Sequence, residues 1–332
     1  MYKKTKNTIF FIEGQEHVRF VEPYLSIVYN IGFKIEIISL ENLDFENPIF
    51  NDFVEIINRN KIRPFLKNIQ GDLFFTTTPG VGSYYFPKIK KTKYIYIFHS
   101  LVSPNEVYLD KSFINFDYIL SPNEIISNQL KFLITSKTKT FNVGYPVLAH
   151  YMNKPQSSNN KILLAPSWGK DSFLFNDDII QKLYEFLSMK NAEIILRPHP
   201  MHLKKIYEND LFQNSKFIID KNKNLDYLKD VSLLITDWSG ISLEYYYLKK
   251  SPTVFIDNIK KIRRKLTKKE SNLELIENKI RNLIGTVINP NNLSNLENIN
   301  LNKNTKLEDE YIDSIYKPEF IDEKVSKIIL SL

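Results

Sequence analysis

The feature that most constrains this chain is a repeated alternation of short β-branched and aromatic runs with longer stretches of mixed polarity. Runs of the first kind suit the buried strands of a parallel sheet, and the longer stretches can form the crossover helices that parallel strands need. The pattern therefore predicts βα units, with helices on both faces of a parallel sheet. At 332 residues, the chain has room for about two such domains.

The predicted strands fall into two sets with a polar stretch between them. The first set comprises residues 8–12, 34–39, 72–76, 94–98, 117–120 and 140–143. The second comprises residues 161–165, 193–196, 216–219, 232–236 and 253–256, and residues 177–189 and 241–249 have the apolar spacing of crossover helices. Residues 152–160 contain turn formers and no apolar period. We predict an α/β fold with two doubly wound, Rossmann-like domains, 1–151 and 152–332, that face each other across a cleft.

Composition limits the kinds of site that the chain can hold. The sequence has no cysteine, which excludes disulfides, thiolate metal sites and a cysteine nucleophile. Zinc-protease, dinucleotide-binding and P-loop motifs do not occur, and we expect no required metal or other cofactor. The apolar run at residues 9–12 is too short for a signal peptide, and no run approaches the length of a membrane span. We therefore expect a cytoplasmic protein.

The charge balance favours anionic partners. Lysine and arginine number 45 against 38 aspartates and glutamates, a net charge of +7. This excess suits an anionic substrate or membrane surface and is too small to indicate nucleic acid. The basic run from Lys260 to Lys269 suits anionic lipid headgroups, which would hold the protein on the inner face of the cell membrane. The alternative for this run is a solvated loop or helix face.

Polar side chains follow four of the predicted strands. His99 follows residues 94–98, and Ser167, Arg197 and Asp237 each come shortly after a strand of the second set. The carboxyl ends of parallel strands meet at one edge of a sheet, and ligands of doubly wound sheets bind outside that edge. The shared placement predicts a functional site.

The segment 237–244 is predicted to be a tight turn that opens a helix, with Ser239 as its N-cap. Amides at a helix amino end bind anions, and Gly240 would let a phosphate approach the backbone closely. Ser242 adds a hydroxyl donor, and Glu244 suits ribose hydroxyls or the helix dipole. An ordinary helix cap is the alternative interpretation.

Two prolines stiffen the segment that presents Arg197 and His199. A guanidinium beside an imidazole suits phosphate oxygens and charge on a leaving group. The alternative is a pair of ordinary surface residues in a loop. His202 lies outside this motif and is expected at the surface.

His99 ends a run that should be a buried central strand, so its ring would emerge at the cleft, where it can accept a proton from a hydroxyl. It is the candidate general base. The alternative is a partly buried histidine that bonds to a neighbouring carbonyl. His17, after the first strand, is a weaker candidate for contact with an acceptor.

The ordered set of these motifs resembles the CDP-glycerol glycerophosphotransferase family, the teichoic-acid-type polymerases and primases with a GT-B fold. The matching pieces are Phe98-His99, Ser121, Gly144-Tyr145-Pro146, residues 162–168, residues 197–200, residues 234–240 and residues 252–257. The chain departs from the family pattern where it has Ser100 in place of glycine, Val147 and Gly169 in place of arginine, and Gly240 in place of serine.

The resemblance implies a GT-B-like fold, with the acceptor on the side of His99 and the nucleotide donor on the second domain. It implies that His99 is the base and that His199 also acts in catalysis. The residues expected to bind the donor are Ser167, Arg197, Thr236, Asp237, Ser239, Gly240, Ser242 and Glu244.

The function expected from the resemblance is transfer of glycerol phosphate, or a related alditol phosphate, from a CDP-activated donor. The acceptor would be a hydroxyl of a cell-surface glycan, a teichoic-acid-like polymer or a lipid-linked saccharide, and CMP would be released. The alternatives are a GT-B nucleotide-sugar glycosyltransferase of surface polysaccharide synthesis, a nucleotide-sugar 2-epimerase, and a non-catalytic glycan-binding subunit.

Overall fold

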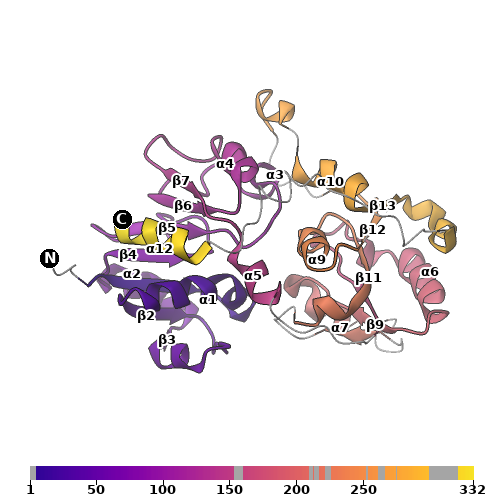
Figure 1. The fold of residues 1–332 in the computed structure, drawn as a ribbon, viewed down its shortest axis with the longest axis horizontal. Helices are drawn as coiled ribbons and strands as arrows, with labels where there is room; N and C mark the ends of the chain where they lie inside the picture. The colour runs from indigo at the N-terminus through magenta and orange to yellow at the C-terminus, as the bar shows by residue number, and fades with distance from the viewer. Residues whose placement is uncertain are drawn as a thin grey trace.

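The computed structural model describes residues 5–152, 160–208, 212, 217–220, 226–251, 253–260, 266–273, 275–298 and 321–332. Its strands form two parallel sheets, one in each half of the chain, and the two halves lie beside each other along the longest axis (Figure 1). Helices cover both faces of each sheet, as the alternating pattern of the sequence predicts. Among the described residues, no helix is long and apolar enough to cross a membrane.

The first sheet has the order β3-β2-β1-β4-β5-β6-β7. Its strands are β1 (Asn7–Ile12), β2 (Lys34–Ser39), β3 (Val54–Ile56), β4 (Leu73–Thr76), β5 (Lys93–Ile97), β6 (Tyr118–Ser121) and β7 (Lys139–Asn142). Its helices are α1 (Gln15–Asn30), α2 (Ile62–Asn68), α3 (Pro104–Val107), α4 (Glu124–Leu130) and α5 (Pro146–Met152), with 3-10 turns η1 (Pro48–Phe53) and η2 (Arg59–Lys61). The strand order reverses between β1 and β4, which is where a doubly wound sheet offers its binding crevice.

The second sheet has the order β10-β9-β8-β11-β12-β13 and reverses between β8 and β11. Its strands are β8 (Lys161–Leu164), β9 (Glu193–Leu196), β10 (Ile218–Ile219), β11 (Val231–Thr236), β12 (Thr253–Ile256) and β13 (Gly285–Ile288). The remaining helices are α6 (Asp177–Ser188), α7 (Leu203–Tyr207), α9 (Ile241–Lys249), α10 (Ile276–Ile284) and α12 (Ile321–Ser331). The 3-10 turns are η3 (Phe173–Phe175), η4 (Pro200–His202), η5 (Asp226–Asp230), η6 (Glu270–Asn272) and η7 (Pro290–Asn298).

The core of the first half explains why its central strands have nearly continuous apolar sequences. Phe75 on β4 and Tyr96 on β5 are fully buried, because helices cover both faces of the strands. Helix α1 buries one stripe at helical spacing, which includes Val18, Val21 and Leu25. The registered strand pairs β1–β4 and β4–β5 then fix which residues lie at the carboxyl edge.

The sequence does not predict β3 and β13, the outer strands at one edge of each sheet. β3 has only three residues with mixed exposure, so it lacks a clear apolar pattern. β13 begins at Gly285, where an added Cβ would lie 2.0 Å from the carbonyl oxygen of Thr253. Only glycine lets the two backbones approach this closely, and the glycine hides the strand from a pattern search.

The last helix differs from the predicted division of the chain, in which all residues after 151 belong to the second domain. Helix α12 packs against α1 of the first half (Figure 1), and its Ile321, Val325 and Ile329 are buried there. The spacing of these residues gives α12 one apolar stripe, and the first half supplies the surface that covers it. Residues 153–159 of the predicted linker lie outside the described residues.

Candidate active site

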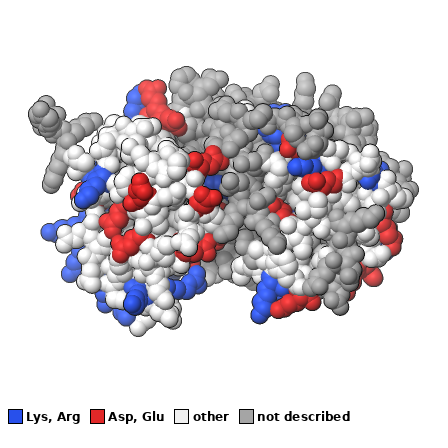
Figure 2. All heavy atoms as spheres, turned by 90° about the horizontal axis from the view of Figure 1, so that it is seen from below, with Lys and Arg blue, Asp and Glu red and all other residues white. Residues whose placement is uncertain are grey.

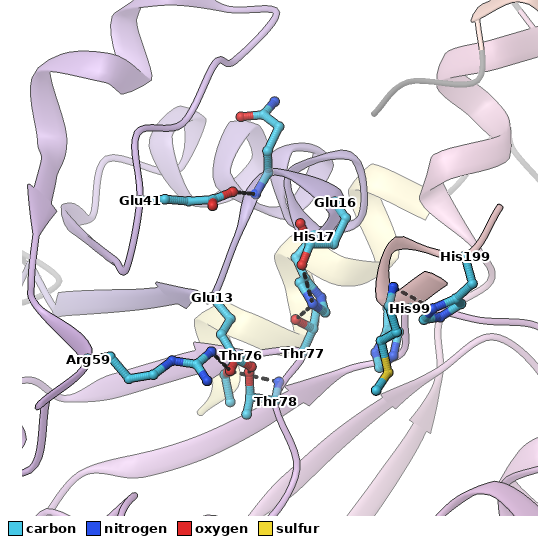
Figure 3. Close-up of polar contacts among 12 residues, drawn as sticks. Glu13, Glu16, His17, Glu41, Arg59, Thr76, Thr77, Thr78, His99 and His199 are labelled. Carbon is cyan, nitrogen blue, oxygen red and sulfur yellow. Dashed lines mark hydrogen bonds and ion pairs between the residues drawn. The ribbon is translucent and has the colours of Figure 1, made fainter. Parts of the chain in front are cut away.

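The carboxyl edges of the two sheets meet at the centre of the molecule. His99 follows β5 of the first half and His199 follows β9 of the second, and they come close together (Figure 3). Gly240, after β11, lies against the segment that follows His99, because an added Cβ there would be 3.0 Å from the Ser100 Oγ. The structure therefore brings the predicted base beside the predicted anion-binding turn.

His99 is held as a neutral imidazole by its surroundings. Its Nδ1 lies 3.2 Å from the hydroxyl of Tyr96, which in turn lies 2.9 Å from the hydroxyl of Tyr108. Burial, together with the nearby basic groups His17, Arg19 and His199, lowers the pKa of His99 to about 3. In the tautomer that carries its proton on Nδ1, the ring donates to Tyr96, and Nε2 can accept a proton from a hydroxyl.

His17 stands next to His99, with ring centroids 5.4 Å apart. Its Nδ1 is 2.9 Å from the Thr77 hydroxyl, and its Nε2 is 3.8 Å from the Glu16 carboxylate. Burial lowers the pKa of His17, while the carboxylates of Glu16 and Glu13 oppose that shift. The second imidazole therefore also favours its neutral form and extends the site along the first half.

Arg197 and His199 both lie at the carboxyl end of β9 and are half-buried. The Arg197 guanidinium is oriented by the Asp220 carboxylate and by the Tyr227 hydroxyl at 3.2 Å. His199 accepts a hydrogen bond from the Met201 amide at 3.3 Å on its Nδ1. This bond leaves the Nε2–H as the donor of the neutral ring, which suits a phosphate oxygen.

The amino end of α9 offers backbone amides. Gly240 is the N-cap residue, and no side chain caps the helix. In the described part of the chain, the amides of Ser239, Gly240 and Ile241 have no hydrogen-bond acceptor. Ser239 and Gly240 are half-exposed, so the amides and the positive end of the helix dipole are accessible to an anion.

The prediction of Ser239 as the N-cap is wrong. Gly240 already has helical backbone angles, φ −62° and ψ −15°, and occupies the cap position itself. The carbonyl oxygen of Ser239 accepts the Ser242 hydroxyl at 2.9 Å. Ser242 is buried, so its hydroxyl closes the turn instead of facing a donor.

Asp237 and Thr236 were predicted to contact the donor directly. In the structure both side chains are fully buried. Asp237 accepts hydrogen bonds from the Ser167 amide and hydroxyl at 2.8 and 2.9 Å, from the Trp238 amide at 2.7 Å and from Asn258 at 3.0 Å. Burial raises its pKa, and these hydrogen bonds oppose the shift. The Thr236 hydroxyl donates to the carbonyl of Ala165 at 2.6 Å. The two residues hold the loops after β8 and β11 together.

Glu244 also differs from its predicted contact with ribose. Its carboxylate is buried and accepts the Tyr145 hydroxyl at 2.7 Å and the Arg19 guanidinium at 3.5 Å. Burial alone would lower the pKa of Arg19, but the carboxylate of Glu244 opposes this effect, and the pKa of Arg19 is raised. Glu244 therefore joins α9 to the first half, with α5 packed on α9 beside it.

Three supporting residues were not predicted from the sequence. Tyr96 orients His99, Asn258 binds Asp237, and His202 is buried and accepts the Gly169 amide at 3.2 Å, contrary to the surface position expected for it. A tyrosine inside a buried strand was the available signal for Tyr96, since its hydroxyl needs a partner there. Asn258 and His202 carried no such signal.

The predicted basic run begins inside the protein. Lys260 pairs with the buried carboxylate of Glu106 and lies 5.0 Å from the centre of the Trp238 ring. Residues 261–265 lie outside the described residues, and Lys268 and Lys269 are exposed. In the part of the chain that the structure describes, no group of three His, Asp or Glu side chains could hold a metal ion.

Several solved structures have a fold similar to that of this chain. The wall teichoic acid polymerase TagF, in a structure with CDPG, is 17% identical with a TM-score of 0.65, over 99% of this chain and 89% of that chain. The UDP-GlcNAc 2-epimerase of Methanocaldococcus jannaschii, in complex with UDP-GlcNAc and UDP, is 15% identical with a TM-score of 0.68, over 98% of this chain and all (100%) of that chain. A putative UDP-N-acetylglucosamine 2-epimerase from Listeria monocytogenes is 13% identical with a TM-score of 0.59, over 98% and 96% of the two chains. These neighbours confirm the expected GT-B-like fold.

The family follows from the sequence model that matches this chain. No curated protein matches the chain. The model of CDP-glycerol:poly(glycerophosphate) glycerophosphotransferase matches residues 48–268, about two thirds of the 332 residues and the span that includes His99, His199 and the amino end of α9. The chain belongs to the CDP-glycerol:poly(glycerophosphate) glycerophosphotransferase family.

Proposed function

We propose that this protein transfers glycerol phosphate, or a related alditol phosphate, from a CDP-linked donor to a hydroxyl of a cell-surface glycan or lipid-linked saccharide. One observation carries the proposal. The accessible amides at the amino end of α9 lie against Ser100, the residue next to the neutral imidazole of His99. An anion site for the donor and a base for the acceptor are therefore adjacent, one on each half. The family supports a glycerophosphotransferase over other transfers.

The arrangement suits an in-line phosphoryl transfer. His99 takes the proton of the acceptor hydroxyl on Nε2, and the oxygen attacks the β-phosphorus of the donor. The new bond joins that oxygen to the β-phosphorus, and the bond from the β-phosphorus to the bridging oxygen breaks. CMP leaves with the bridging oxygen and its electron pair. The α9 amides, Arg197 and His199 stabilise the charge on the leaving phosphate.

The donor is identified by a thermal-shift screen of the purified protein against CDP-glycerol, CDP-ribitol, CMP-linked sugars and UDP-linked sugars. A ligand at about a hundredfold over its Kd adds roughly 2.7 kcal/mol to the stability. We expect CDP-alditols to raise the melting temperature and UDP-sugars to leave it unchanged. Stabilisation by a UDP-sugar alone would overturn the proposal in favour of glycosyl transfer or epimerisation, and the absence of any shift would favour a non-catalytic subunit.

A further inference from the structure

The segment that follows His99 is bound by the second half of the chain. Ser103 is the N-cap residue of α3, and its amide donates to the Glu277 carboxylate of α10 at 2.6 Å. Its hydroxyl accepts the Ile276 amide at 2.9 Å, so a serine of the first half binds the first amide of α10. The loop that carries the candidate base is therefore anchored to the half that holds the donor turn.

Lys260 is joined to the same segment by charge. It follows β12 of the second half, and its ammonium is paired with the Glu106 carboxylate of α3 and lies 3.8 Å from the Glu277 carboxylate. The three side chains are only 16%, 7% and 8% exposed. Many other charged side chains lie on the surface of both halves (Figure 2), where water and salt screen an ion pair. In a buried pair, by contrast, loss of one partner leaves the other charge uncompensated.

The same lysine contacts the turn between β11 and α9, to which Trp238 belongs. Its ammonium lies 5.0 Å from the centre of the Trp238 ring, and the Arg281 guanidinium lies 3.7 Å from that centre. Arg281 is paired with Asp257 of the second half at 3.1 Å, whereas Lys260 is paired with the first half. Contact of a cation with an indole ring is strongest where both are shielded from water. Lys260 therefore joins α3 to the turn that carries the α9 amides.

The surroundings of Lys260 do not suit direct binding of an anion. Its ammonium lies beside the carboxylates of Glu106 and Glu277. A third buried carboxylate of this interface, that of Glu270, accepts the side-chain amide of Asn105 at 3.2 Å. A phosphate at the ammonium would displace one carboxylate and would be repelled by the others. Lys260 can therefore act on the reaction only through the residues that it holds.

We propose that Lys260 is a positioning residue of the transfer, which, through Glu106 and Trp238, holds the α9 turn of the second half at a fixed distance from His99 of the first. This inference rests on the proposed function. In-line attack needs the base, the acceptor oxygen and the donor phosphorus in one geometry, and a displacement of about 1 Å can cost about a hundredfold in rate. The first lysine of the basic run then belongs to the site and not to a membrane-binding surface.

The test compares Lys260→Met, which removes the charge, and Lys260→Arg, which keeps it, with the unaltered protein. CMP release from CDP-glycerol gives kcat, with a panel of oligosaccharide glycosides and their glycerol phosphate derivatives as acceptors, and titration gives the Kd of CDP-glycerol. We expect Lys260→Met to lower kcat about tenfold to a hundredfold and to change this Kd by less than about twofold, because the α9 amides are untouched. Lys260→Arg should retain most of the rate.

A double variant separates positioning from stability. Lys260→Met leaves the buried Glu106 carboxylate uncompensated and should destabilise the fold, and the addition of Glu106→Gln removes that charge and should restore stability in urea unfolding. The link between the two halves stays broken, so kcat should remain low. Recovery of kcat together with stability would show that Lys260 only keeps the protein folded, and would overturn the inference.

Lys88→Met is the matched control. Lys88 is paired with Asp117 at 3.3 Å and lies 5.5 Å from the centre of the Tyr94 ring, so it makes the same two kinds of contact within the first half. Its kcat should equal that of the unaltered protein. Unchanged kcat in Lys260→Met, or an equal loss in Lys88→Met, would overturn the inference alone. No CMP release by the unaltered protein with any acceptor, although it binds CDP-glycerol, would overturn the proposed function and the inference with it.

Discussion

Helices α1 and α9 both begin at the carboxyl edge of a sheet, but different groups contact their amino ends. At α1, the Gln15 amide is bound by Glu41, and Glu16 lies over Gly14. At α9, no side chain caps the helix and the amides around Gly240 are accessible. The same backbone geometry thus offers an anion site in one half and a carboxylate surface in the other. The chemistry of each half depends on which side chains reach the helix end, and not on the fold.

The contact between the halves explains why α9 stays open. An added Cβ at Gly240 would lie 3.0 Å from Ser100 Oγ and 3.2 Å from Val102 Cγ1, so a side chain has little room there. Relative to the family pattern, serine and glycine have changed places at these two positions, since the chain has serine at 100 and glycine at 240. The Ser100 hydroxyl of the first half therefore lies beside Gly240.

The largest expected effect tests whether proton transfer by His99 is independent of donor binding at the amino end of α9. His99→Ala should lower turnover by about a hundredfold to ten-thousandfold, the usual contribution of a general base. The α9 amides are untouched, so stabilisation by CDP-glycerol in a thermal shift should be the same as for the unaltered protein. CMP release gives the rate. Turnover near that of the unaltered protein would show that His99 is not the general base.

The next effect tests whether Asp237 is structural. Asp237→Ala would leave the Ser167 and Trp238 amides without their acceptor and should destabilise the fold by about 3 kcal/mol, measured by urea unfolding. Asp171→Ala, at an exposed loop position, is the control and should change stability by less than about 0.5 kcal/mol. The structural role would be contradicted if the two variants were equally stable and Asp237→Ala no longer bound the donor. Asp237 would then contact the donor directly.

A smaller effect tests how much space the anion site needs. Gly240→Ala should weaken CDP-glycerol binding about tenfold, because the new methyl group forces Ser100 and the turn apart. Adding Ser100→Gly should restore most of the affinity, with a coupling of about 1 kcal/mol between the two sites. Additive losses in the double variant, measured by titration of the donor, would mean that the two residues do not share this space.

Most of the fold could be predicted from the sequence, because strands and helices leave local patterns of apolar residues. The bounds of β2, β9, β12 and α9 were predicted to the residue, and His99, His199 and Gly240 were placed at the edge where the structure has them. The burial of the Asp237 and Glu244 side chains could not be predicted, because the residues that bind them are distant along the chain. Ser167 is 70 residues from Asp237, and Arg19 is 225 residues from Glu244. A buried carboxylate and a ligand-binding one look alike until the opposing loop is in place.

The smallest expected effect concerns the partner of the base. Tyr96→Phe removes the hydroxyl that pairs with Nδ1 of His99, so the ring can take either tautomer and only one leaves Nε2 as acceptor. We expect kcat to fall about three- to tenfold with KM unchanged, which is the behaviour of a positioning residue.

The pH profile distinguishes this role from proton transfer by Tyr96 itself. Burial raises the pKa of Tyr96 well above 10, so the phenol stays protonated at working pH, and the alkaline limb of kcat should be the same with and without the hydroxyl. Burial lowers the pKa of His99 to about 3, so the base is already deprotonated at neutral pH, and activity should fall only as the pH approaches that value. An alkaline limb present in the unaltered enzyme and absent from Tyr96→Phe would show that Tyr96 ionises during turnover. The same kcat in both proteins would show that burial alone orients His99.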